Sequence, residues 1–319
     1  MDPAIEARGL AKRYGDFTAV EDLSVAIPRG EVFGFLGPNG AGKTTSIRMI
    51  AGLTRPSAGE VWIEGSRVDT RARDHRGLVG LCPQDLVVWE HLTCKENLLF
   101  LGDMYAVPRR ENVKRARELL VRLRLEEKAD QLASKLSGGM KRRLNLALAL
   151  IHDPPILVLD EPSAGLDPQS RIVVHDFIQD LGAKEGKTVI LTTHEMDVAD
   201  RLSTRVAIMD RGRLKVVDTP ERLKNTVGEG DTVVLRLKDA SRAEEAARAA
   251  GNVEGVRAAV AVSREVRFQA LNSVARLREV YGVLEKAGIE VEDASLRKNT
   301  LEDVFIQLTG RALREEGGP

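Results

Sequence analysis

The chain has 319 residues, with 48 Lys and Arg against 48 Asp and Glu, so its formal net charge is zero. This balance argues against bulk nucleic acid as the main partner, because no general excess of cations is available to displace counterions. No apolar run approaches the ~18 residues of a membrane-spanning helix, and residues 1–4 lack the features of a secretory signal. Cys82 and Cys94 are the only cysteines, which favours free thiols in a reducing cytoplasm.

Short apolar runs separated by turn residues predict an α/β core with an antiparallel N-terminal portion. The uninterrupted run Ile156–Leu159 is typical of a strand covered on both faces of a parallel sheet. Leucines at helical spacing between Lys95 and His152 indicate an inserted helical block. The predicted strands are Ile5–Leu10, Leu23–Ile27, Val32–Leu36, Val61–Ile63, Leu78–Leu81, Ile156–Leu159, Val189–Leu191 and Val206–Met209.

A change in composition at Gly228–Gly230 marks a second domain. Its pattern predicts the order βαββαβ, a small ferredoxin-like α+β domain. Ser241 with Glu244 reads as a capping box that opens an alanine-rich helix. The predicted strands are Thr232–Leu237, Val256–Val262, Val266–Ala270 and Ile289–Leu296, and a second helix spans Val274 to Leu284. We therefore expect domains at 1–228, with a helical subdomain at about 87–152, and at 229–310, followed by a disordered tail at 311–319.

The segment after the predicted strand Val32–Leu36 fits the phosphate-binding pattern G-x-x-x-x-G-K-[ST]. Its residues are Gly37, Pro38, Asn39, Gly40, Ala41, Gly42, Lys43 and Thr44. Glycines let successive backbone N–H groups turn toward an anion, and the following helix adds the partial positive charge of its N-terminus. Lys43 can reach the β- and γ-phosphates, and the Thr44 hydroxyl can bind Mg²⁺. The alternative is an ordinary glycine-rich turn, which the strand and helix on either side disfavour.

Three further polar residues follow predicted strands. Asp160 ends a buried strand, where a carboxylate lies beside the phosphate loop and can order the Mg²⁺ shell. Glu161 comes next and is placed to activate water, although a solvated loop acid is its simpler interpretation. His194 follows the strand Thr188–Thr193 and is a candidate for a γ-phosphate contact, against the alternative of a packed or surface histidine.

The segment Leu136-Ser137-Gly138-Gly139-Met140, together with these motifs, resembles the ATP-binding-cassette (ABC) ATPases from Ile5 to about Arg222. The resemblance implies a P-loop core with a mixed sheet and a helical subdomain, and it implies ATP and Mg²⁺ as cofactors. It assigns Lys43, Glu161 and His194 to catalysis and Thr44, Gln84 and Asp160 to the metal. Nucleotide contacts are implied for Tyr14, Gly37, Pro38, Asn39, Gly40, Ala41, Gly42, Lys43, Thr44, Thr45, Gln84, Ser137, Gly138, Gly139 and Asp167.

The resemblance also implies that two copies pair head to tail. Each ATP is then held by the phosphate loop of one copy and by Ser137, Gly138 and Gly139 of the other. Because the γ-phosphate belongs to the interface, its loss weakens the dimer. Met140 stands where the family usually has glutamine, and its thioether lacks the hydrogen-bond donors of an amide.

The motifs occur once, which favours a transport subunit that acts with a separate multi-span membrane permease at the inner face of the cell membrane. Segment 301–310 resembles the tail of drug- and sodium-exporting ABC ATPases, which implies export of drug-like or other small hydrophobic cargo. The loop from Gln84 to about Tyr105 is the expected docking edge. Ordinary core is the alternative for its apolar residues Val87, Val88 and Trp89. A soluble regulatory or nucleic-acid-associated ATPase, and a nucleotide sensor with little turnover, are the other hypotheses.

Overall fold

The computed structural model describes residues 3–68, 77–226, 230–270, 272–297 and 299–309. The chain divides into two compact units, one built mainly from residues 1–219 and one from residues 220–312. The predicted tail at 311–319 lies outside the described residues.

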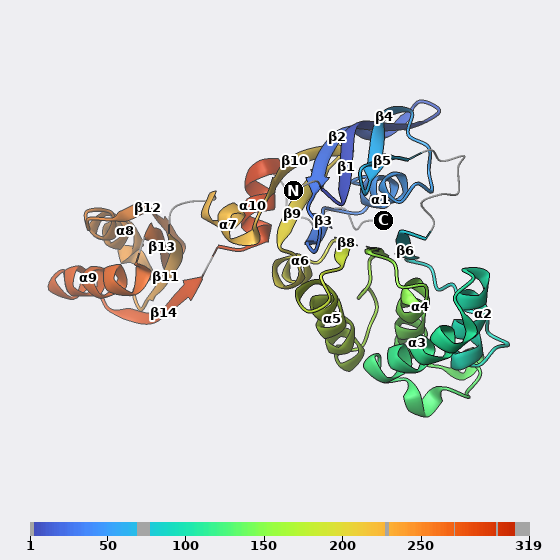
Figure 1. Cartoon of the computed structure of the whole chain (residues 1–319). Helices are drawn as coiled ribbons and strands as arrows, with labels where there is room; N and C mark the ends of the chain where they lie inside the picture. Colours follow the sequence, from blue (N-terminus) through green and yellow to red (C-terminus); the bar gives the residue numbers. More distant parts are fainter. Residues whose placement is uncertain (1–2, 69–76, 227–229, 271, 298, 310–319) are drawn as a thin grey trace. The chain divides into compact units, whose positions relative to one another are not determined.

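A six-stranded sheet with the order β10-β9-β3-β8-β7-β6 forms the centre of the first unit (Figure 1). All of its neighbouring strands run parallel except the β9–β10 hairpin. The strands are β3 (Val32–Leu36), β6 (Val79–Cys82), β7 (Ile156–Asp160), β8 (Thr188–Thr193), β9 (Arg205–Asp210) and β10 (Arg213–Asp218). The polar residues that follow β3, β7 and β8 therefore meet at one edge of the sheet.

Both faces of this sheet are buried, as the uninterrupted apolar runs predict. Ile156 and Val158 face a core shared with an antiparallel sheet of order β2-β1-β4-β5, whereas Leu157 and Leu159 face the helices. The second sheet consists of β1 (Ile5–Tyr14), β2 (Phe17–Ile27), β4 (Ala58–Ile63) and β5 (Ser66–Arg67). Helix α1 (Lys43–Ile50) packs within the core between the sheets.

The helical block lies to one side of the six-stranded sheet (Figure 1). It contains α2 (Cys94–Met104), α3 (Arg109–Arg122), the short 3-10 helices η1 (Glu126–Lys128) and η2 (Ala133–Lys135), and α4 (Gly138–Leu150). Helix α2 begins with a capping box formed by Thr93 and Glu96. Helices α5 (Pro168–Ala183) and α6 (Met196–Leu202) complete the unit. Both cysteines are free and buried, and burial raises the pKa of the Cys82 thiol to about 11.

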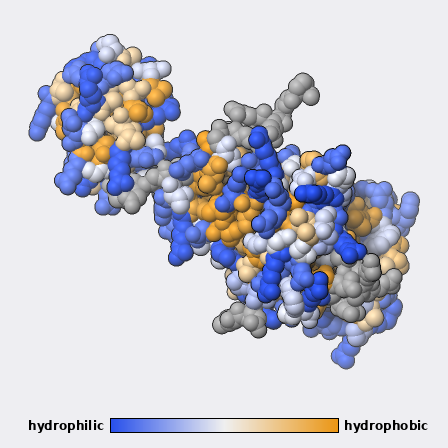
Figure 2. Space-filling view, turned by 90° about the horizontal axis from the view of Figure 1, so that it is seen from above, coloured by the Kyte–Doolittle hydropathy of each residue, from blue (hydrophilic) through white to orange (hydrophobic). Residues whose placement is uncertain are grey.

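The second unit has the order β11 (Asp231–Leu237), η3 (Ala240–Arg242), α8 (Ala243–Gly251), β12 (Val256–Val262), β13 (Glu265–Ala270), α9 (Ser273–Lys286) and β14 (Val291–Arg297). Its antiparallel sheet has the strand order β12-β13-β11-β14. The βαββαβ succession agrees with the sequence pattern, while the assignment to a ferredoxin-like family stays a prediction. Hydrophilic and hydrophobic residues are interspersed over the surface of this unit in Figure 2.

Two details differ from the sequence-based expectation. The second unit begins at Pro220 rather than at residue 229, because α7 (Pro220–Thr226) packs against α10 (Leu301–Thr309) and Asn299 donates to the carbonyl oxygen of Lys224. The predicted capping box at Ser241 is wrong. Ser241 instead donates from its N–H and its hydroxyl to Asp239, which caps η3 one turn before α8 begins.

Candidate nucleotide site

The glycine-rich loop joins β3 to α1, as its sequence context predicts. Gly42 caps α1 with a φ of 95°, a left-handed conformation that residues with a side chain rarely adopt. A Cβ atom at Gly42 would also lie 2.5 Å from the carbonyl oxygen of Ala19. Glycine is therefore required at this position for two reasons: the left-handed turn, and the close approach of the β2 backbone.

Lys43, the first residue of α1, is only 6% exposed. Its Nζ atom donates to the carbonyl oxygens of Gly37 at 2.7 Å and Pro38 at 3.0 Å, and it lies 3.7 Å from Oε1 of Glu161. Burial lowers the pKa of the Lys43 ammonium, and the carboxylates of Glu161 and Asp160 oppose that shift. The loop thus holds a buried cation beside its own backbone and a carboxylate, in a position where it can pair with a polyanion.

Thr44 and Asp160 bring two oxygen donors together at the edge of the sheet. The hydroxyl of Thr44 donates to Oδ1 of Asp160 at 3.0 Å. Neighbouring ligands of an octahedral Mg²⁺ with metal–oxygen distances of about 2.1 Å are about 3 Å apart, so this pair fits two adjacent positions of such an ion. A hydroxyl and one carboxylate leave further positions open, and Mg²⁺ usually fills most of these with phosphate oxygens and water.

Glu161 follows Asp160 and is 6% exposed, so it is not the solvated loop acid of the simpler interpretation. Its two carboxylate oxygens lie 2.9 and 3.0 Å from Nδ1 of His194, which follows β8. The backbone of Glu161 has a φ of 50°. The structure therefore assembles Lys43, Asp160, Glu161 and His194, which are far apart in the sequence, within one cluster.

Thr192 belongs to the same cluster and was missed in the sequence. Its Oγ1 donates to Oδ1 of Asp160 at 2.7 Å and accepts from the N–H of Glu161 at 3.0 Å. The Thr192 hydroxyl thus orients Asp160 by binding its carboxylate, and it orients Glu161 by binding its backbone N–H. The sequence offered one signal for this role: Thr192 is a polar residue near the end of a buried strand, and a buried hydroxyl needs a hydrogen-bond partner.

The segment Ser137–Met140 forms the start of α4. Ser137 is the N-cap, and its Oγ accepts from the N–H of Met140 at 3.3 Å. Ser137 and Gly138 are exposed. A Cβ atom at Gly139 would lie 2.5 Å from Oγ of Ser170, so the start of α4 packs closely on the start of α5. Met140 packs against the core of the helical block, so its side chain is a packing group.

The remaining predicted nucleotide contacts come from several other segments of the first unit. Tyr14 is 52% exposed at the end of β1, with Nζ of Lys12 5.0 Å from its ring centroid. Gln84 is exposed in the loop after β6. Asp167 caps α5 by accepting from the N–H of Ser170 at 2.9 Å, and this bond lowers the pKa of its carboxyl. In the loop, Asn39 and Gly40 are exposed, and Pro38 and Ala41 are buried.

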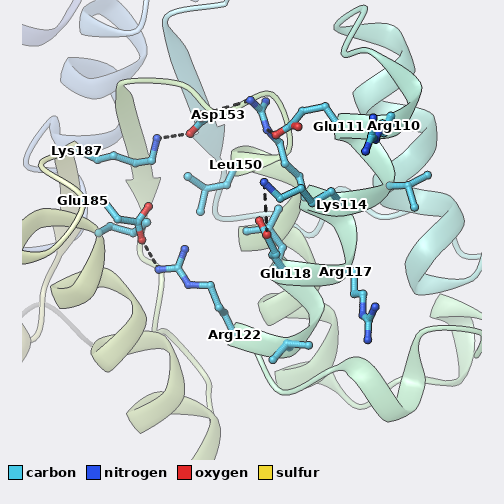
Figure 3. A pocket seen from close by; sticks show the side chains of 15 residues that line it. Arg110, Glu111, Lys114, Arg117, Glu118, Arg122, Leu150, Asp153, Glu185 and Lys187 are labelled. Atoms are coloured by element: carbon cyan, nitrogen blue, oxygen red, sulfur yellow. Dashed lines mark hydrogen bonds and ion pairs between the residues drawn. The ribbon is translucent and has the colours of Figure 1, made fainter.

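A cavity of about 790 Å³ lies elsewhere in the first unit, between α3 and the chain that follows α5 (Figure 3). Many of its lining charges neutralise one another: Arg122 pairs with Glu185, and both Lys187 and Arg115 pair with Asp153. None of the predicted nucleotide residues lines this cavity. It is separate from the cluster of Lys43, Asp160, Glu161 and His194.

Comparisons with known proteins identify the family. The sequence profile described as "ABC transporter" matches residues 20–164. The daunorubicin resistance ATP-binding protein DrrA2 of Streptomyces coeruleorubidus is 38% identical over 308 residues, which cover 96% of this chain and 95% of that protein. The chain belongs to the ABC transporter family. This ABC ATPase is also 38% identical over 312 residues to the Nod factor export ATP-binding protein I of Burkholderia lata, with 98% of each chain covered.

Solved structures agree with that assignment. The dimeric, post-hydrolysis state of the ATP-binding cassette MJ0796 bound to ADP and Pi has a TM-score of 0.62 and 27% identity, covering 67% of this chain and 98% of that one. The ABC ATPase described here therefore binds ATP and hydrolyses it, and the family resemblance read from its motifs is confirmed.

Proposed function

We propose that this ABC ATPase binds Mg²⁺–ATP between two copies of itself and powers a separate membrane permease that exports drug-like or other small hydrophobic cargo. The central observation is the buried carboxylate of Glu161, held between Nζ of Lys43 and Nδ1 of His194 beside the phosphate loop. The names of the relatives, which concern daunorubicin resistance and Nod factor export, support the export role.

The chemistry assigns a distinct task to each side chain. Lys43 binds the β- and γ-phosphates, and Thr44, Asp160 and Gln84 would hold Mg²⁺, which supplies positive charge to the transferring phosphoryl group. Glu161 takes the proton of the attacking water, a step worth about 10²–10⁴-fold in rate. His194 fixes the orientation of that carboxylate through Nδ1. Tyr14 stacks on the base, a contact worth about 1–3 kcal/mol where it is measured in nucleic-acid complexes.

The serine–glycine turn supports a dimeric arrangement. Ser137 and Gly138 are exposed at the N-terminus of α4, where N–H groups and the helix dipole attract an anion. In our proposal that anion is the γ-phosphate bound to the other copy. The dimeric form of the MJ0796 cassette supports this arrangement.

An apolar groove of about 480 Å³ is the proposed docking surface for the permease. Leu53 and Val87 line it and are 57% and 52% exposed. Trp89 also lines the groove but packs against the helical core, as Val88 does. The expected docking edge is therefore divided between surface and core. Within the described part of the chain, no helix has the length and apolarity to cross a bilayer. A separate permease then brings this subunit to the inner face of the membrane.

The substitution Glu161→Gln tests the catalytic proposal. We expect ATP affinity to be retained, turnover to fall by at least about 100-fold, and ATP to convert the variant to a dimer on size exclusion with light scattering. Glu185→Gln, which removes an exposed ion pair with Arg122, is the matched control and should leave turnover unchanged. A Glu161→Gln protein that stays monomeric with ATP would contradict the two-copy arrangement.

The substitution Val87→Asp tests the docking proposal. Tagged wild-type protein should recover a multi-span membrane protein from detergent-solubilised membranes of its own cells, and Val87→Asp should not. Val121→Asp is the matched control, because Val121 is 50% exposed on α3 and does not line the groove. Equal recovery by all three proteins would exclude the groove as the docking surface.

A further inference from the structure

Arg142 is a buried arginine in the middle of the site that no motif assigns. It lies on α4, one turn after the serine–glycine segment, and is 5% exposed. Within the described part of the chain, every hydrogen bond from its guanidinium goes to a backbone carbonyl oxygen. The acceptors are Pro83 (Nη1, 2.7 Å), Gln84 (Nη1, 2.8 Å), Asp160 (Nη2, 2.6 Å), Glu161 (Nη2, 2.6 Å) and Pro162 (Nε, 3.1 Å).

These five bonds join two functional segments, residues 83–84 and 160–162, through one side chain. The carbonyls of Pro83 and Gln84 belong to the loop after β6, which continues into the apolar groove. Two of the remaining carbonyls belong to Asp160, the proposed metal ligand, and to Glu161, the proposed general base. Asn145, three residues further along α4, extends the contact by accepting from the N–H of Val87 at 3.2 Å. Helix α4 thus holds the loop and the catalytic strand end against each other.

The backbone at Glu161 needs such support. Its φ of 50° is left-handed, a conformation that persists at a non-glycine residue only when neighbouring groups hold it. Thr192 binds the N–H of Glu161, and Arg142 binds its carbonyl oxygen. A planar guanidinium can serve acceptors on several sides at once, whereas the ammonium of lysine is a single point with three donors. This arrangement of acceptors therefore requires the guanidinium of arginine, and the ammonium of lysine cannot replace it.

We propose that Arg142 is a positioning residue for ATP hydrolysis: it fixes the Glu161 carboxylate for water activation and links its position to the Gln84 loop. The inference rests on the proposed role of Glu161. It predicts that weakening the Arg142 bonds lowers the rate of hydrolysis while leaving ATP binding, which depends on the phosphate loop, largely intact.

Arg143 provides a matched control on the same helix. It is 8% exposed, and its Nη1 donates to the carbonyl oxygens of Leu123 and Arg124 in the helical block, away from the cluster. Both arginines are thus buried and bound to backbone oxygens. If Arg142 only stabilises the fold, kcat should fall with Tm in the same way in both sets of variants. If Arg142 positions Glu161, kcat should fall at a given Tm in the Arg142 variants alone.

The experiment compares Arg142→Lys and Arg142→Gln with Arg143→Lys and Arg143→Gln, measuring ATP affinity, kcat and Tm for each. We expect the Arg142 variants to lose at least about tenfold in kcat with ATP affinity within about threefold of wild type, and Arg143 variants of equal Tm to keep kcat within about threefold. Two variants at each position allow comparison at matched Tm if one of them folds poorly. Equal kcat losses at equal Tm, or an Arg142→Lys protein with wild-type kcat, would overturn the inference.

Glu161→Gln is measured in the same series to separate the two proposals. If it abolishes turnover while Arg142→Lys does not change it, only the role of Arg142 fails. If Glu161→Gln keeps wild-type turnover, the proposed function of Glu161 fails and the role of Arg142 fails with it.

Discussion

Nδ1 of His194 lies 2.9 Å from Oε2 and 3.0 Å from Oε1 of Glu161, so one ring nitrogen contacts both oxygens of a buried carboxylate. The two residues follow the neighbouring parallel strands β7 and β8. The pair exists only because the sheet places these strand ends side by side. It makes His194 the neighbour that sets the orientation of the proposed general base.

Replacing His194 with alanine should therefore lower kcat for ATP by about 10–100-fold, because a misoriented base loses part of its 10²–10⁴-fold contribution. ATP affinity should change much less, since Lys43 and the loop backbone remain. Steady-state hydrolysis and equilibrium nucleotide binding measure the two effects. His91→Ala, at an exposed histidine, is the control. A loss confined to affinity would show that His194 serves binding instead.

Removal of the Lys43 ammonium should act mainly on binding. Charge-assisted bonds to phosphate are worth about 1.5–3 kcal/mol, so Lys43→Ala should weaken ATP binding by about 10–100-fold. Equilibrium binding of a fluorescent ATP analogue measures the change. Lys184→Ala, which removes an exposed lysine paired with Asp180, should bind as wild type does. Unchanged affinity in Lys43→Ala would exclude the loop as the phosphate site.

Met140 should prove to be a packing residue. Its side chain contacts the helical core, so Met140→Gln buries an amide there and should cost about 1 kcal/mol of unfolding free energy in urea titrations. ATP turnover should stay within about threefold of wild type, because Ser137, Gly138 and Gly139 are unchanged. Met140→Leu, which conserves volume, is the control. A tenfold rise in turnover of the glutamine variant would indicate that this side chain reaches the nucleotide.

His152 should make stability depend on pH. Burial lowers the pKa of its imidazole from an ordinary value of 6.5 to about 4, and its ring stacks on Tyr105 at 3.8 Å between centroids. Between these two pH values the unfolded chain binds a proton that the folded chain does not, so stability falls as the pH falls from 6.5 toward 4. Above pH 6.5 the histidine is neutral in both states and its effect vanishes.

The variant His152→Phe keeps a stacking ring that cannot take up a proton. Its Tm should fall less steeply than that of wild type between pH 6.5 and pH 4, as measured by circular dichroism. His91→Phe, at an exposed position, should keep the wild-type slope. Identical slopes in wild type and His152→Phe would show that another group carries the acid sensitivity.

The sequence was sufficient to predict the family, the phosphate loop and the α/β class, because these depend on local patterns: glycine spacing, a lysine at a helix start, and apolar runs of strand length. It also placed Asp160, Glu161 and His194 at strand ends. What it could not supply was the pairing between distant segments. The Thr192 hydroxyl that orients Asp160, the Arg142 bonds to two separate loops, and the packing of α7 on α10 all join residues remote in the chain. Such contacts depend on strand order and helix packing, which are properties of the folded chain and leave no local pattern in the sequence.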